Sequence, residues 1–256
     1  MFKMISAEVY RLKKSESFWI MLLVIGVLSA MFSVAFGLIP SEQLMGMRPE
    51  SAGEMFMTGF SSITQNVLFL LIGFTIVFIN SDFTSGTIRN PLAVGVSRIN
   101  YLAGKLVTIL LTCLLFSVVG VLATGLPYLI FEPWGDMFNL SNFLASFAIG
   151  YLILVAQATL FMMIAFLTRK VGATLGIIIG YILFDATLGA FIMMVEIDGI
   201  IRTLANILPS PAGFYLGELS MGTAEFGNVM VIVVIAVATI VVASAIALRS
   251  LIKKDV

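Results

Sequence analysis

The residues that could take part in chemistry gather in one short stretch, residues 82–105, between two long apolar runs. Its sequence, DFTSGTIRNPLAVGVSRINYLAGK, contains Arg89, Arg98 and Lys105. Basic side chains at a membrane surface can pair with carboxylates of a partner protein or with anionic lipid headgroups. Gly86 and Pro91 break the preceding apolar run, so the chain must turn at that surface. The pattern therefore indicates ionic docking.

Catalytic chemistry has no support in the sequence. No G-x-x-x-x-G-K-[ST] phosphate loop occurs, because Gly104-Lys105 is followed by Leu106. The chain has no histidine, the commonest metal ligand and general base, and its single cysteine, Cys113, has no partner for a disulfide or a cysteine metal site. We expect no catalytic residue, no metal site and no cofactor bound by this chain.

The elements that position the stretch are apolar helices. The chain is 60% hydrophobic and 11% charged, whereas a soluble domain is nearer half apolar and a quarter charged. This excess predicts an all-α integral membrane protein, folded as a single transmembrane domain over residues 1–256. A helix needs about 20 apolar residues to cross the hydrocarbon. Six segments meet this requirement: 18–39, 63–80, 103–131, 143–168, 171–194 and 228–248.

Basic residues predict the orientation of these spans. With the six spans in place, every Lys and Arg except Arg48 and Arg202 falls on one side, while most acidic residues fall on the other. Loops rich in Lys and Arg remain in the cytoplasm. We therefore expect a multi-pass protein of the cytoplasmic membrane with both termini inside.

Two segments outside the spans are also patterned. Residues 2–16 are amphipathic, which favours an interfacial helix in the inner leaflet over a plain positively charged anchor. The external residues 195–227 contain an apolar stretch too short to cross twice, followed by Pro209, Pro211 and Gly213. This pattern favours a re-entrant or interfacial helical hairpin over an ordinary loop.

Polar side chains within the spans are candidates for a substrate path. Asp185 is the acid that lies deep in a span, about 22 Å from Lys170 at 1.5 Å per residue. An intramembrane carboxylate either contacts a substrate or pins two helices together, and both interpretations are open. Gln157 lies near the middle of the fourth span, where a hydrogen bond to a neighbouring helix is favoured over substrate contact.

Glycines recur along one face of the fifth span. Gly172, Gly176 and Gly180 are spaced so that another helix backbone can approach closely. Packing within one subunit is favoured over contact with a second copy.

Residues 82–105 resemble the permease subunit of a type-2 ATP-binding cassette (ABC) exporter. In that family an acidic residue is followed by Gly-Thr, a basic residue, apolar positions, Ser-Arg and Gly-Lys. The matching positions here are Asp82, Gly86, Thr87, Arg89, Leu92, Ser97, Arg98, Gly104 and Lys105. The order of elements along the chain resembles the family as well, although Asp82 stands where glutamate is more usual.

The resemblance implies that residues 82–100 form a coupling loop, with a short coupling helix that docks on a separate nucleotide-binding ATPase. ATP and magnesium would then be bound by that partner, and a second permease copy or a sister permease would complete the transporter within the lipid bilayer. Gly95-Val-Ser-Arg98 resembles the bacitracin/lantibiotic-type subgroup, which exports peptides, antibiotics or other amphipathic compounds.

The alternative is an ATP-independent secondary carrier or a membrane scaffold protein. A carrier should have several intramembrane ionisable residues and internal repeats. The sequence offers Asp185 alone and no convincing repeat, so the exporter subunit is preferred. We expect no nucleic-acid partner.

Overall fold

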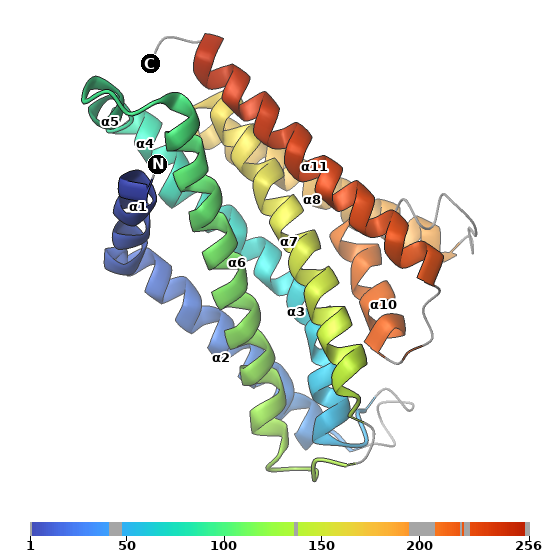
Figure 1. Cartoon of the computed structure of the whole chain (residues 1–256). Coiled ribbons are helices and arrows are strands. Elements are labelled where there is room, and N and C mark those ends of the chain that lie inside the picture. Colours follow the sequence, from blue (N-terminus) through green and yellow to red (C-terminus); the bar gives the residue numbers. More distant parts are fainter. Residues whose placement is uncertain are drawn as a thin grey trace.

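The computed structural model describes residues 2–40, 48–135, 138–194, 208–220, 222 and 226–253. All regular secondary structure within these ranges is helical (Figure 1). The elements are α1 (Phe2–Lys14), α2 (Glu16–Leu38), α3 (Ala52–Thr75), the π-helix η2 (Ile76–Asn80), α4 (Ser81–Thr84), α5 (Arg89–Ala93), α6 (Arg98–Tyr128), α7 (Leu140–Thr168), α8 (Val171–Met194), α10 (Pro209–Ser220) and α11 (Phe226–Lys253). The all-helical prediction is confirmed for the described residues.

Five of these helices are long and apolar enough to cross a membrane. They are α2, α6, α7, residues Val171–Phe191 of α8 and residues Asn228–Lys253 of α11. The predicted span 63–80 falls within α3 and η2, where the apolar helix found among the described residues, Phe69–Thr84, is shorter than the other five. The six-span layout therefore stays a prediction.

Helix boundaries differ from the apolar runs because polar caps decide them. α3 begins at Ala52, well before its apolar run, since the Ser51 side chain accepts a hydrogen bond from the Glu54 amide. α6 begins at Arg98, where Ser97 accepts a hydrogen bond from the Asn100 amide. α6 ends at Tyr128, directly after Pro127.

The centre of the bundle is formed by α6 and α7. The buried share of the apolar 18-residue stretch is 61% in α7 and 44% in α6. It is only 17% in each of α2, α8 and α11. α7 contacts α11, α3, α10, α6 and α8, while α6 contacts α2, α3 and α1 (Figure 1). The outer helices therefore present most of their apolar surface away from the bundle, as a lipid environment requires.

The N-terminal segment forms a helix that packs on α6. The chain bends after α1 at Ser15, whose backbone is extended and whose side chain caps α2 by accepting a hydrogen bond from the Phe18 amide. Gly104 on α6 permits the close approach of α1, because a Cβ at this position would lie 3.2 Å from Cγ of Glu8. The helix predicted over 2–16 is thus present, and its interfacial position stays a prediction.

One helix of the expected external hairpin is described. α10 has 12 residues, about 18 Å at 1.5 Å per residue, which is too short to span the hydrocarbon. It packs against α3 and α7, and Ser146 near the start of α7 donates a hydrogen bond to the Leu216 carbonyl. Residues 195–207 lie outside the described part of the chain, so the hairpin itself stays a prediction.

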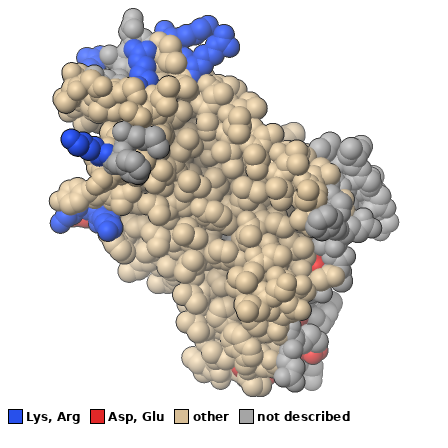
Figure 2. All heavy atoms as spheres, in the orientation of Figure 1, with Lys and Arg blue, Asp and Glu red and all other residues tan. Residues whose placement is uncertain are grey.

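Charge divides the bundle lengthwise. Lys and Arg side chains gather at the end where α1, α5 and the C-terminal end of α11 lie, and Asp and Glu appear mainly toward the other end on the face shown (Figure 2). We call these the basic end and the opposite end. The separation agrees with the pattern predicted from the sequence.

Candidate functional site

The predicted coupling loop projects from the basic end of the bundle (Figure 1). α4 continues directly from the π-helix η2, and the chain then turns at Gly86, runs through α5 and turns again at Gly95 before α6 begins. The φ angles of Gly86 and Gly95 are +70° and +89°, in the left-handed region that glycine adopts most readily. These two glycines set α5 between two sharp turns.

One side of this loop is anchored and the other is exposed. The Ile88 side chain is buried and packs in the main apolar core. Arg89 and Asn90 are exposed, and Val94 is 86% exposed. Among the described residues, the Arg89 side chain has no ion pair or hydrogen bond. The side chain of Leu92 lies outside the described part. A short segment that exposes both a cation and an apolar side chain is a surface that suits a protein partner.

A buried ionic cluster lies at the base of the loop. It contains Glu8 of α1, Asp82 of α4 and Lys105 of α6, together with Arg11 and Tyr101. Lys105 Nζ lies 2.9 Å from Glu8 Oε2 and 2.6 Å from Asp82 Oδ2. Because these three residues come from three helices, the cluster ties α1, the loop and α6 together.

Asp82 is the centre of this ionic cluster. Its carboxylate accepts from Tyr101 Oη at 2.6 Å and from Thr87 Oγ1 at 3.4 Å, and pairs with Arg11 Nη1 at 2.5 Å. Burial raises the pKa of this carboxyl, but Lys105, Tyr101 and Arg11 outweigh that effect, so the net direction of its pKa is downward. Asp82 therefore stays ionised at neutral pH.

Aromatic rings and a carbonyl complete the surroundings of the two cations. The Arg11 guanidinium carbon lies 4.7 Å from the centroid of the Phe78 ring, and Lys105 Nζ lies 4.8 Å from the same centroid. Lys105 also donates to the Phe78 carbonyl at 3.3 Å. A buried ammonium ion requires such a complete set of partners, because each lost partner leaves charge uncompensated in a low dielectric.

Some of the predicted docking residues are already bound to other parts of the bundle, and the others lie on the loop. Asp82 is 2% exposed and faces inward, where it supports the loop. Arg98 Nη1 donates to the Ile252 carbonyl at 2.6 Å, so it binds the last turn of α11. Gly86, Thr87 and Arg89 lie on the loop itself, and Ser97 caps α6. The exposed part that remains for contact with a partner is α5 and its flanking turns.

A second basic residue also holds the end of α11. Arg169 occupies the turn between α7 and α8 with φ of +56° and donates to the Ser250 carbonyl at 3.1 Å. Ser250 in turn donates to the Phe166 carbonyl at 2.9 Å. Burial, and then the nearby Arg98, lower the pKa of Arg169, although a guanidinium remains charged. Cations at a helix C-terminus offset the partial charge of its free carbonyls.

The polar residues predicted within the spans lie close together. Tyr181 of α8 donates a 2.6 Å hydrogen bond to Oε1 of Gln157 on α7, as the interhelical interpretation of Gln157 expects. Asp185 is one turn further along α8, is 2% exposed and acts electrostatically on Tyr181. These three residues form a buried polar group between α7 and α8.

The glycine ridge on α8 lies on an exposed face of the helix. Gly172, Gly176 and Gly180 are exposed, and within the described chain no neighbouring element has an atom within 4 Å of a Cβ built on any of them. Packing of this ridge within the subunit therefore has no support among the described residues and stays a prediction. α8 lies at the edge of the bundle and turns its other side, with Thr174 and Ile178, toward the core.

Sequence reasoning did not identify Glu8, Tyr101 or Asn80. Asn80 lies in the π-helix and donates to Thr174 of α8 at 2.7 Å, which ties the base of the loop to a further helix. A signal for Glu8 was present, because it falls on the apolar side of an amphipathic helix, three and four residues from Ile5 and Leu12. An acid in that position needs a buried partner, but the sequence did not show that the partner is Lys105.

Comparisons with known proteins identify the family of this chain. A search of the curated proteins found no match. A family model described as ABC-2 family transporter protein matches residues 4–187, which is more than half of the chain and runs from α1 into α8. With five helices apolar enough to cross a membrane among the described residues, the chain is a multi-pass membrane protein that belongs to the ABC-2 transporter family.

Proposed function

We propose that this chain is the transmembrane subunit of an ATP-driven exporter, and that its basic end faces the cytoplasm and binds a separate ATPase. The observation that carries the proposal is the exposed surface of α5 and the turn after it, with Arg89 and Val94, above a buried ionic cluster. Family membership supports the role of a membrane component. ATP and Mg²⁺ are bound by the partner, and this chain supplies no catalytic group.

The ionic cluster gives the loop a rigid base. A force applied to α5 reaches Asp82, and through its ion pairs it reaches α1 and α6 together. Arg98 carries the same displacement to the end of α11. Packed helices move as units rather than deform. ATP-driven closure of the partner would therefore rock whole helices and open a path toward the outside.

We propose that a second permease, either a copy or a sister chain, packs beside this one. The exposed glycine ridge on α8 supports this arrangement, since small residues allow close backbone contact in membranes. The cargo we infer is an amphipathic peptide, an antibiotic or a lipophilic compound.

The test of ATPase docking is the variant Arg89→Glu. It should abolish co-purification with the nucleotide-binding protein encoded beside this chain, because the exposed guanidinium is replaced by a repelling carboxylate. The matched control is Lys170→Glu, which reverses an exposed charge at the same end but outside the loop. Normal assembly of Arg89→Glu with the ATPase would contradict the docking role and favour an ATP-independent carrier.

The role of Asp185 is tested separately by Asp185→Asn. We expect normal expression but reduced export, because the amide retains the shape and removes the charge within the buried polar group. Gln157→Glu in the same background tests whether charge alone is required. Unchanged export by Asp185→Asn would reduce Asp185 to a helix-packing role.

A further inference from the structure

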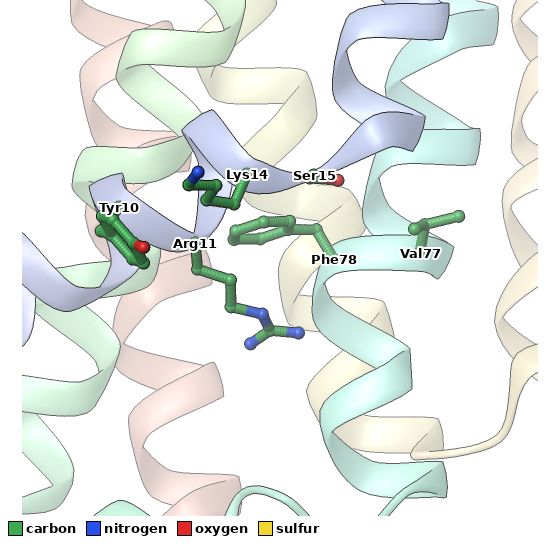
Figure 3. A pocket seen from close by; sticks show the side chains of 6 residues that line it. All are labelled: Tyr10, Arg11, Lys14, Ser15, Val77 and Phe78. Carbon is green, nitrogen blue, oxygen red and sulfur yellow. The ribbon is translucent and has the colours of Figure 1, made fainter.

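A pocket lies between α1 and the π-helix η2 at the basic end, outside the surface proposed to bind the ATPase. Its volume is about 480 Å³. The residues that line it are Tyr10, Arg11, Lys14, Ser15, Val77 and Phe78 (Figure 3). Four of these come from the end of α1 and the turn that follows it, and two come from the end of the second predicted span.

The polar side of the pocket carries free positive charge. Lys14 is exposed and has no ion pair among the residues that the structure describes. Arg11 pairs with Asp82 through Nη1 and donates to Ser81 through Nη2, but its side chain is 40% exposed. A guanidinium has five N–H donors, so Arg11 retains donors for a ligand. None of the described residues that line the pocket is acidic.

The other side of the pocket is apolar. Val77 is 39% exposed, and the Phe78 ring forms the wall over which Arg11 lies. Tyr10, which lines the pocket, is 64% exposed, and Trp19, which donates to the Lys13 carbonyl at 2.9 Å, is 53% exposed. Exposed tyrosine and tryptophan next to basic residues are typical of the membrane–water interface. A ligand that fits both sides has an anionic head and an apolar tail.

We propose that this pocket binds the headgroup of an anionic phospholipid. The phosphate contacts Lys14 and the outer donors of Arg11, the hydroxyl groups of Tyr10 and Ser15 are within the same lining, and the first part of an acyl chain lies along Val77. Free phosphate shares the headgroup chemistry, but it would leave the apolar wall unused. Because Arg11 also pairs with Asp82, the bound phosphate is one side chain away from the base of the coupling loop.

The experiment measures lipid retention by the purified full-length protein with native mass spectrometry. The protein is incubated in detergent with phosphatidylglycerol or phosphatidylcholine. Lys14→Gln should lower the retained phosphatidylglycerol about fivefold, the effect of about one charge near an anionic headgroup. The matched control is Lys13→Gln, which removes the neighbouring exposed charge without touching the pocket. Val77→Trp fills the apolar side, and it should lower retention while leaving both cations in place.

Three results would overturn the proposal. Equal losses for Lys13→Gln and Lys14→Gln would show diffuse attraction to the basic end and no defined site. Equal retention of phosphatidylglycerol and phosphatidylcholine would show that charge is not recognised. Displacement of phosphatidylglycerol by millimolar inorganic phosphate would assign the pocket to a soluble anion. None of these measurements depends on an ATPase partner, so they are independent of the proposed transport function.

Discussion

The two ends of α6 each carry an ionic cluster, and the clusters differ in burial. At the basic end, Lys105 has no exposed side-chain surface and contacts two carboxylates that are 5% and 2% exposed. At the opposite end, Arg48 Nη2 lies 2.8 Å from Glu132 Oε1, with side chains 18% and 32% exposed. Arg48 also donates to the Tyr128 hydroxyl at 3.3 Å. Water can replace the ion-pair partners of Arg48 and Glu132, but it has little access to the buried cluster around Lys105.

This difference indicates which end of the molecule transmits force. Removal of one member of a buried ion pair leaves an uncompensated charge, whereas an exposed pair contributes little to stability. The buried cluster therefore resists small displacements of α1, α4 and α6 relative to one another. We infer that the basic end moves as a unit and that the opposite end is free to open.

The largest effect is expected for Lys105→Met. The substitution leaves Glu8 and Asp82 buried without their shared cation, which should lower the free energy of unfolding by about 3–5 kcal/mol. Unfolding in detergent, monitored by tryptophan fluorescence, measures this loss.

A double variant sharpens this result. Glu8→Gln combined with Lys105→Met removes the carboxylate that depends most on Lys105, because Asp82 retains Arg11 and Tyr101. Part of the stability should return in a double-mutant cycle. Additive losses would contradict a direct interaction between the two side chains.

An intermediate effect is expected for Arg98→Gln. Hydrogen bonds from charged groups contribute about 1.5–3 kcal/mol, and this variant removes the one that reaches the Ile252 carbonyl. Hydrogen exchange should become faster in the last turn of α11. If exchange there is unchanged, Arg98 does not hold α11, and its side chain is available to the ATPase instead.

The smallest effect is expected for Arg48→Gln. Exposed ion pairs contribute about 0–1 kcal/mol, so unfolding should be nearly that of the parent chain. A loss as large as that of Lys105→Met would remove the distinction between the two ends. The same unfolding assay measures both variants.

The sequence was sufficient for features that depend on local pattern. Apolar runs predicted five helices that the structure contains, and Gly86 marked the turn before α5. Pro91, which was predicted to break the chain with Gly86, lies within α5 itself. The amphipathic pattern predicted α1. Each of these follows from periodicity or from backbone preference within a few residues.

Features that depend on tertiary contacts could not be predicted in this way. Glu8 and Lys105 are 97 positions apart, and no local pattern joins them. Asp82 was predicted to be a docking residue from its place in the family motif, but in the structure its carboxylate is buried and pairs with Lys105 and Arg11. The spacing of the glycines on α8 predicted close helix packing, but spacing alone does not show whether that helix face points inward.

We propose that the basic end, with its coupling loop, faces the compartment of the ATPase. A cysteine introduced at the exposed Asn90 and labelled with a membrane-impermeant maleimide tests this directly. The native Cys113 is buried, so the parent chain should remain unlabelled, and Glu50→Cys at the opposite end should react in intact cells. We expect Asn90→Cys to be labelled only after the membrane is permeabilised. Labelling of Asn90→Cys in intact cells would contradict it.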